Sequence, residues 1–190
     1  MKLSRLALSV GLMLLFSGVS NAQTMVQFES GFITNDDGGI AYLANTGNLA
    51  IIDQQGGGGG GATRLDIYTT TGMFLNSVTL STAGLAAGEE FLDNGLADMP
   101  NGNVIVVTTL GNIFEVNPLT GAIVPGGYGG FNVLSAMPPG AETAGFAFDP
   151  STRDLWMIDD NGNPFDTLTQ FSSTGAVLSG PIFALPGNLN

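Results

Sequence analysis

A pattern of short apolar segments and turn residues recurs three times along this chain of 190 residues. Each repeat opens with a glycine, and the openings lie 56 and 50 residues apart, at Gly39, Gly95 and Gly145. Each repeat also contains a Thr-Gly pair, with glycines 49 and 54 residues apart, at Gly72, Gly121 and Gly175. A period near fifty residues indicates that one supersecondary unit is copied and stacked along the chain.

The third repeat, Gly145–Leu178, shows the unit most clearly. Gly145–Asp149 and Leu155–Ile158 are apolar runs of the length expected for buried strands. Asp166–Ser172 follows a polar loop and alternates polar with apolar residues, which predicts a half-buried strand. After the Thr-Gly turn, Ala176–Leu178 forms the last and outermost strand. The repeat is therefore predicted to be one four-stranded antiparallel meander.

The two earlier repeats share this order of segments. In the first, the predicted strands are Gly39–Leu43, Leu49–Asp53, Leu65–Tyr68 and Thr71–Leu75. In the second, they are Gly95–Asp98, Val104–Val107, Asn112–Val116 and Leu119–Val124. Four strands in each repeat of about fifty residues predict an all-β fold, a β-propeller-like array of three blades at about 39–80, 95–124 and 145–185. The alternative is a β-sandwich whose turns are similarly spaced by coincidence.

The segment Gly145–Pro150, followed by Leu155 and Trp156, resembles the two inner strands of NHL-type and gluconolactonase-like propeller blades. The chain is similar to secreted bacterial propellers of this kind from Gly39 to about Leu185. Such propellers include lactonases, lyases, esterase-like proteins and binding scaffolds. The resemblance therefore implies a fold without selecting an activity.

The first 22 residues, Met1–Ala22, have the features of an export signal. Lys2 and Arg5 form its positive start, and Leu6–Phe16 is an apolar core too short to span a bilayer comfortably. Small residues precede the predicted mature start at Gln23, so the domain is assigned to 23–190. We expect a protein that is secreted, periplasmic or held at the cell surface; a retained membrane anchor is the alternative.

The composition excludes several kinds of partner and chemistry. Once the signal is removed, Arg64 and Arg153 face all sixteen acidic residues, so nucleic acid and anionic membranes are poor partners. The chain contains no His and no Cys. This excludes disulfides, Ser-His-Asp triads, cysteine nucleophiles and the commonest zinc ligands. No catalytic residue can be assigned, and the sequence favours a protein that is not an enzyme.

Acidic residues stand just before each predicted inner strand: Asp37, Asp93 and Glu142. In a propeller these positions come from successive blades and converge near one mouth of the central channel. The gluconolactonase-like resemblance implies that carboxylates and Asn side chains at such a mouth hold a divalent ion. Calcium or magnesium suits oxygen ligands of this kind, and Asn35 and Asn94 are candidate neutral ligands. The alternative is that these acids only keep loops solvated.

A second group of candidate ligands follows the second strand of the third repeat. Asp159, Asn161 and Asn163 alternate like the opening of a calcium-binding loop. Pro164 stands where that loop requires glycine, and Gln170 stands where it requires glutamate, which excludes an EF-hand. Two interpretations remain: a shallow calcium site, or a turn stabilised by Asx-type hydrogen bonds.

Three blades cannot close a ring, because propellers have four to eight. We expect that the sequence is part of a longer propeller, with Phe183–Asn190 leading into another blade. The alternatives are a ring completed by several chains, or a crude fourth blade that includes the strand candidate Val26–Glu29.

The predicted function is that of an exported propeller scaffold that binds an extracellular polysaccharide, protein or matrix component. One alternative is a calcium-dependent hydrolase or lactonase of the gluconolactonase-like type. Another is a structural component of the cell surface, with chains that associate through their open blade edges.

Overall fold

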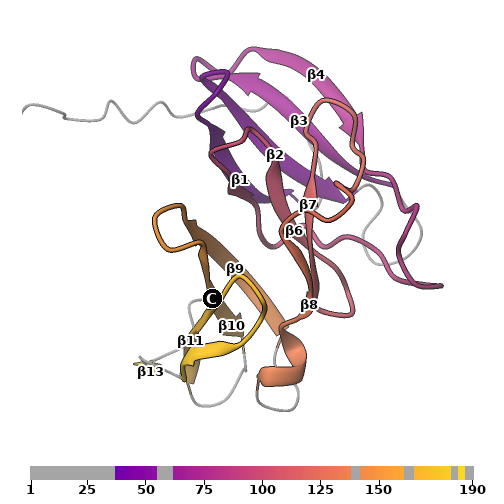
Figure 1. Ribbon diagram of the computed structural model, residues 1–190. Coiled ribbons are helices and arrows are strands. Elements are labelled where there is room, and N and C mark those ends of the chain that lie inside the picture. Colours follow the sequence, from indigo (N-terminus) through magenta and orange to yellow (C-terminus); the bar gives the residue numbers. More distant parts are fainter. Residues whose placement is uncertain (1–36, 55–61, 138–141, 161–164, 181–183, 187–190) are drawn as a thin grey trace, which may run out of the picture.

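The computed structural model describes residues 37–54, 62–137, 142–160, 165–180 and 184–186, and within them the chain forms three antiparallel sheets (Figure 1). The first sheet contains β1 (Asp37–Leu43), β2 (Asn48–Gln54), β3 (Thr63–Thr69) and β4 (Phe74–Thr79). The second contains β5 (Ala97–Asp98), β6 (Val104–Val107), β7 (Asn112–Val116) and β8 (Gly129–Asn132). The third contains β9 (Glu142–Asp149), β10 (Asp154–Asp160), β11 (Phe165–Phe171), β12 (Val177–Ser179) and β13 (Ala184–Pro186).

In each sheet the strands of one repeat lie side by side in chain order, as a meander. The prediction of an all-β, propeller-like array of antiparallel sheets is therefore confirmed. Two predicted Thr-Gly turns close hairpins, because Gly72 and Gly175 adopt φ values of 85° and 82°. Their amides donate hydrogen bonds of 3.0 Å to the carbonyl oxygens of Thr69 and Ser172, respectively.

The outer strand of the second sheet differs from the prediction. Leu119–Val124 was expected there, but this segment contributes only an isolated bridge, between Val116 and Ile123. The strand that pairs with β7 is β8, whose sequence Gly-Gly-Phe-Asn carries no alternating pattern. The Gly- and Pro-rich segment Pro125–Gly130, whose composition is typical of a loop, thus contains the start of this strand.

The end of the described chain adds a strand to the third sheet. Ala184–Pro186 pairs with the first residues of β11, and that the segment ending at Asn190 leads into another blade stays a prediction. Ala184 lies opposite Thr167, while β12 pairs with the other end of β11, near Phe171. Both segments run antiparallel to β11, so β13 adds to the third sheet.

The second sheet lies between the other two and is buried on both faces. Along β6, Val104 and Val106 join one apolar core with residues of the first sheet. Ile105 and Val107 join a second core with residues of the third sheet. All four side chains are fully buried, as alternation along a strand covered on both sides requires.

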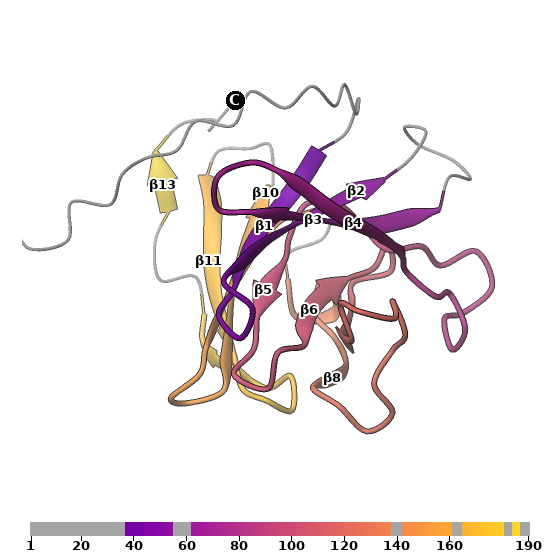
Figure 2. The ribbon, with the colours of Figure 1, turned by 90° about the horizontal axis from the view of Figure 1, so that it is seen from above.

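The inner strands of successive sheets are neighbours, because β1 contacts β5 (Figure 2) and β5 contacts β9. The approach is close at Gly38, where an added Cβ would lie 1.6 Å from the carbonyl oxygen of Asp93. Gly95 is similarly covered by the ring of Phe146, 2.3 Å from the position of an added Cβ. Two of the predicted opening glycines, or their direct neighbours, thus let inner strands pack together.

Within the described ranges, helical structure is limited to a 3-10 turn at Leu134–Ala136, and no helix there has the length and apolar character of a membrane span. The predicted export signal Met1–Ala22, the strand candidate Val26–Glu29 and the glycine run Gly56–Gly61 lie outside the described residues.

Candidate functional site

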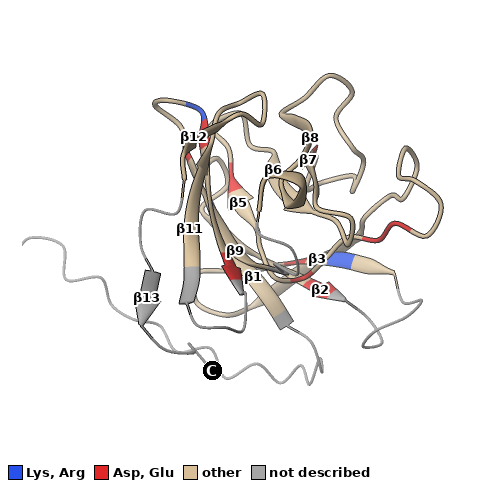
Figure 3. Ribbon diagram, turned by 90° about the horizontal axis from the view of Figure 1, so that it is seen from below, with Lys and Arg blue, Asp and Glu red and all other residues tan. Residues whose placement is uncertain are grey.

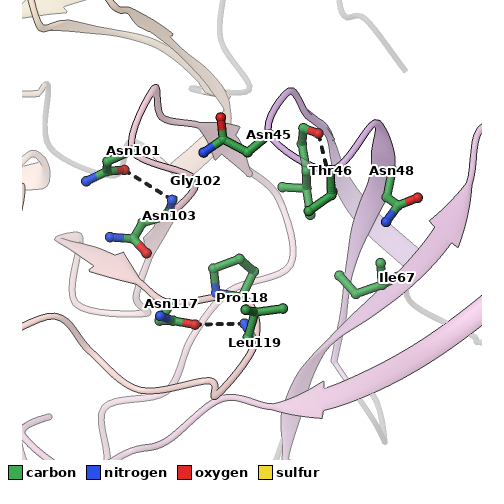
Figure 4. A pocket seen from close by; sticks show the side chains of 11 residues that line it. Asn45, Thr46, Asn48, Ile67, Asn101, Gly102, Asn103, Asn117, Pro118 and Leu119 are labelled. Carbon is green, nitrogen blue, oxygen red and sulfur yellow. Dashed lines mark hydrogen bonds between the residues drawn. The ribbon is translucent and has the colours of Figure 1, made fainter.

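A cleft of about 240 Å³ opens between the first and second sheets (Figure 4). Three turns surround it: the β1–β2 turn, the β5–β6 turn and the connection that follows β7. Five of its lining side chains are carboxamides, namely Asn45, Asn48, Asn101, Asn103 and Asn117. Leu43 and Ile67 contribute a buried apolar floor, and the exposed Leu119 stands at the rim. The cleft therefore combines an apolar base with many hydrogen-bonding groups.

The turns hold these amides in fixed places. Asn117 Oδ1 accepts a hydrogen bond of 2.9 Å from the amide of Leu119 and so closes an Asx turn. Asn45 packs over Gly102, whose missing Cβ leaves the space that the Asn45 amide fills. Gly102 has a φ of 84°, which glycine adopts without strain, so the β5–β6 turn can bend against the first sheet.

A buried carboxylate lies beneath the β5–β6 turn. Glu115 of β7 is only 4% exposed, and its Oε1 accepts hydrogen bonds from Asn101 Nδ2 at 2.8 Å and Asn103 Nδ2 at 2.5 Å. Its Oε2 accepts a third bond of 2.6 Å from the amide of Tyr128. Because an ionised carboxylate only accepts hydrogen bonds, both amides must turn their NH₂ groups toward it and their oxygens elsewhere. Glu115 therefore orients two of the carboxamides that line the cleft.

Electrostatics keep this carboxylate charged. Burial raises the pKa of Glu115, but the hydrogen bonds from Tyr128, Asn103 and Asn101 outweigh burial and leave the pKa below its ordinary value. The Arg153 guanidinium lowers it further. Burial, helped by the Asp154 carboxylate, raises the pKa of Tyr128 to about 12, so this phenol stays neutral.

A second cleft, of about 310 Å³, lies between the second and third sheets at the neighbouring turns. Met99, Pro100 and Asn101 line one side, and Phe148, Pro150 and Arg153 line the other. Arg153 has a φ of 64°, which is uncommon for a residue with a side chain, and its carbonyl oxygen accepts a hydrogen bond of 3.2 Å from the Tyr128 hydroxyl. Asn101 borders both clefts.

The predicted acidic residues lie at the starts of the inner strands, where the backbones meet. The amide of Gly39 in β1 donates to the carbonyl oxygen of Asp93, which precedes β5. Asn94 Nδ2 donates a bond of 2.5 Å to the carbonyl oxygen of Thr143 in β9. The carbonyl oxygen Oδ1 of the Asn94 side chain and the Thr143 hydroxyl are buried without a hydrogen-bond partner in the described part of the chain.

Asp37 and Glu142 are the first residues of β1 and β9, and their side chains lie outside what the structure describes. Among the residues that are described, no three acidic side chains gather in a way that could hold a metal ion. The calcium site at Asp37, Asp93 and Glu142 remains a prediction. Figure 3 shows an acidic residue, in red, on β5, and few basic residues, in blue, in the described part of the chain.

The second predicted group is described only at Asp159. This residue ends up fully buried near the end of β10, where its Oδ1 accepts bonds of 2.5 Å from both the amide and the hydroxyl of Thr167. Asp159 also pairs with Thr143 across the sheet, so the two predicted groups lie in the same region of the molecule. Asn161 and Asn163 lie outside the described residues.

Sequence reasoning missed the asparagine-lined cleft, although a signal for it was present. The β1–β2 turn, Asn45–Asn48, and the β5–β6 turn, Pro100–Asn103, occupy the same position in their repeats, and both end in Gly-Asn. Because adjacent blades place equivalent turns next to each other, matching asparagines in these turns predict a shared polar cleft.

The three sheets and the cleft between two of them define an all-β, propeller-like chain with a polar site at its turns. No family model matches the chain, and no curated protein matches its sequence. Solved structures similar to it include the glutaminyl cyclase of Myxococcus xanthus, with 15% identity and a TM-score of 0.38 over 65% of this chain and 67% of that one.

A puromycin-hydrolysing peptidase of Mycobacterium tuberculosis is also similar, with 15% identity and a TM-score of 0.35. That similarity covers 81% of this chain but 30% of the peptidase. At these TM-scores neither similarity bears on what this chain does.

Proposed function

We propose that this chain is an exported, propeller-like binding module whose ligand is a neutral polysaccharide held in the asparagine-lined cleft. The observation that carries the proposal is the set of five carboxamides above an apolar floor. A carboxamide donates and accepts hydrogen bonds, as a sugar hydroxyl does, so several amides in one cleft match a polyhydroxylated ligand. The apolar floor and Leu119 suit the C–H face of a sugar ring.

The charge of the chain narrows the ligand class. Asp and Glu number 16 against 4 Lys and Arg, so an anionic polymer would be repelled. The cleft is also smaller than the pockets that enclose whole drug-sized molecules, which suits a short stretch of a longer polymer.

Export is part of the proposal, and it rests on the charged start and apolar core of Met1–Ala22. We therefore expect N-terminal sequencing of the protein recovered outside the cytoplasm to give Gln23 as the first residue. The NHL-type and gluconolactonase-like resemblance of the inner strands agrees with this placement. A start at Met1 would contradict it.

Binding is tested by calorimetric titration with soluble neutral oligosaccharides, using the full chain and two variants. Asn48→Ala removes one amide from the cleft, and Asn76→Ala removes an exposed amide from β4 as the matched control. Since one neutral hydrogen bond contributes about 0.5–1.5 kcal/mol, we expect Asn48→Ala to weaken binding roughly 3- to 10-fold. The control variant should bind as the unchanged chain does.

Two results would contradict the proposal: no heat with any neutral glycan, or equal affinity in all three proteins. Melting temperatures with calcium and then with EDTA test the alternative, a calcium-dependent hydrolase. That alternative draws support from the hydrogen bond between Asn94, next to Asp93, and Thr143, and it requires calcium to raise the melting temperature.

A further inference from the structure

The first sheet presents an apolar face on the side away from the second sheet. On β1 the side chains alternate, so Ala41 and Leu43 join the core while Ile40 and Tyr42 are 53% and 54% exposed. Cross-strand pairing extends this outward face through β2 and β3 to β4. Its apolar residues are Ile40, Tyr42, Leu49, Ile51, Tyr68 and Phe74, of which Ile40, Tyr42 and Phe74 are exposed, and Arg64 and Asp66 of β3 lie on the same face.

The third sheet presents an apolar face at the opposite end of the array. Its core-facing residues on β10 are Leu155 and Met157, so Trp156 and Ile158 point to the other side. Trp156 pairs with the exposed Ala147, and Ile158 pairs with Leu168. This outward face is partly exposed.

Equivalent positions in the three repeats show which buried faces of the chain these two outward faces correspond to. The residue two places after each opening glycine is alanine: Ala41, Ala97 and Ala147. Ala41 and Ala97 are buried by the sheet that follows them in the chain, whereas Ala147 is exposed. The outward face of the third sheet therefore corresponds to the faces of the first and second sheets that the next sheet in the chain covers.

The same comparison holds for the residue directly after each opening glycine. Leu96 and Phe146 pack against the sheet that precedes them in the chain, whereas Ile40, at the equivalent position, is exposed. The outward face of the first sheet therefore corresponds to the faces of the second and third sheets that pack against the preceding sheet in the chain. The two outward faces are the two halves of one further blade-to-blade junction.

We propose that a second copy of this chain completes that junction, so that two copies close a ring of six sheets. The first sheet of each copy covers the third sheet of the other, and the two contacts are related by a twofold axis. Six sheets fall within the four to eight that close a propeller, and a closed twofold arrangement leaves neither apolar face open.

The area agrees with a stable dimer. A four-stranded sheet of seven residues per strand measures about 23 by 19 Å, on the order of 400 Å² per face. Two junctions cover four such faces, on the order of 1,600 Å², which is the usual size of a specific protein–protein interface.

Charge does not oppose this contact. The ion cluster next to the apolar face of the first sheet is internally paired, because Arg64 Nη2 lies 2.8 Å from Asp53 Oδ2 and Arg64 Nε lies 3.1 Å from Asp66 Oδ1. Both carboxylates are already buried in the single chain, so docking would remove only the partly exposed Arg64 from water, and Arg64 is paired with them.

Cysteine cross-linking tests the head-to-tail geometry, since the chain has no cysteine of its own. Ile40→Cys and Ala147→Cys replace exposed residues on the two inner strands that would meet across the junction. The double variant is expected to oxidise to a covalent dimer, and mixing the two single variants is expected to give one mixed dimer. Each single variant alone should stay uncross-linked, as should the control Asn76→Cys on β4.

Light scattering of the unchanged chain provides the second readout, with a mass of two chains expected at micromolar concentration. Tyr42→Glu should give a monomer that keeps its β-sheet circular dichroism. The proposal is overturned if the unchanged chain is monomeric, if Ile40→Cys cross-links to itself, or if the double variant forms a disulfide within one chain.

Discussion

Glu115 shows how one buried residue shapes the cleft. It lies beneath the turn between two inner strands, and its carboxylate holds Asn101, Asn103 and the amide of Tyr128. The side-chain amides of Asn101 and Asn103 line the cleft, so their orientation depends on the Glu115 carboxylate, which a ligand does not need to contact. The sequence around Glu115 gave no sign of this role, because the partners come from different turns and meet only in the folded sheet.

The hydrogen bonds to Glu115 predict an acid-sensitive contribution to stability. Because they leave its folded-state pKa below the ordinary value of 4.5, ionised Glu115 stabilises the fold above pH 4.5. This contribution is lost as pH falls through the lowered pKa. Glu115→Gln should lower the free energy of unfolding by about 1–3 kcal/mol at pH 7, since an amide NH₂ replaces an acceptor.

The measurement is the melting temperature of both proteins between pH 7 and pH 3. The difference between the unchanged chain and Glu115→Gln should shrink as pH falls, while Glu90→Gln, the control, should follow the unchanged chain. A difference that stays constant across this range would show that Glu115 is not the group that titrates.

At the scale of elements, most strands could be predicted because apolar runs and turn residues alternate at strand length. The prediction succeeded for the inner strands and for β10 and β11, where burial on one or both faces leaves a clear pattern. It failed at β8, because Gly129 and Gly130 lack the side chains that would mark a strand. It also placed a strand at Leu119–Val124, where Ile123 packs against the core of the first two sheets without extended strand pairing.

The sequence did not predict the asparagine-lined cleft or the outer strand β8, and the physical reason is the same for both. The cleft forms between turns of two different sheets, and β8 pairs with β7 across the loop that connects them, so both depend on how segments meet in the folded chain. The sequence records such contacts only as a glycine or an asparagine in a turn.

Gly129 allows the close packing of β8 against β7 to be tested by mutation. Its φ is 107°, and a Cβ there would lie 2.2 Å from the carbonyl oxygen of Ile113 in β7. Gly129→Ala should therefore lower the free energy of unfolding by about 2–4 kcal/mol, through backbone strain and displacement of β8.

The matched control is Gly130→Ala, because Gly130 also has a positive φ, of 74°, but has no atom within 4 Å of an added Cβ. Its cost should be limited to about 1–2 kcal/mol of backbone strain. Denaturant titration compares the two variants, and equal losses would mean that β8 does not pack closely against β7.

At the scale of the whole molecule, the order of the sheets follows the order of the chain. The second sheet separates the other two, so each of its faces contacts a different neighbour. This arrangement creates the cleft between the first two sheets, and it leaves an apolar face at each end of the array. The binding proposal and the ring proposal therefore depend on the same packing, but each has its own test.

Methyl–methyl nuclear Overhauser effects, measured on the chain labelled at Ile, Leu, Val and Met methyls, test this packing most directly. We predict contacts from Val106 to Ile52 and from Ile105 to Met157, since the two faces of β6 belong to different cores. Direct contacts between Ile52 and Met157 would contradict the account, because they would place the first and third sheets face to face as the two layers of a sandwich.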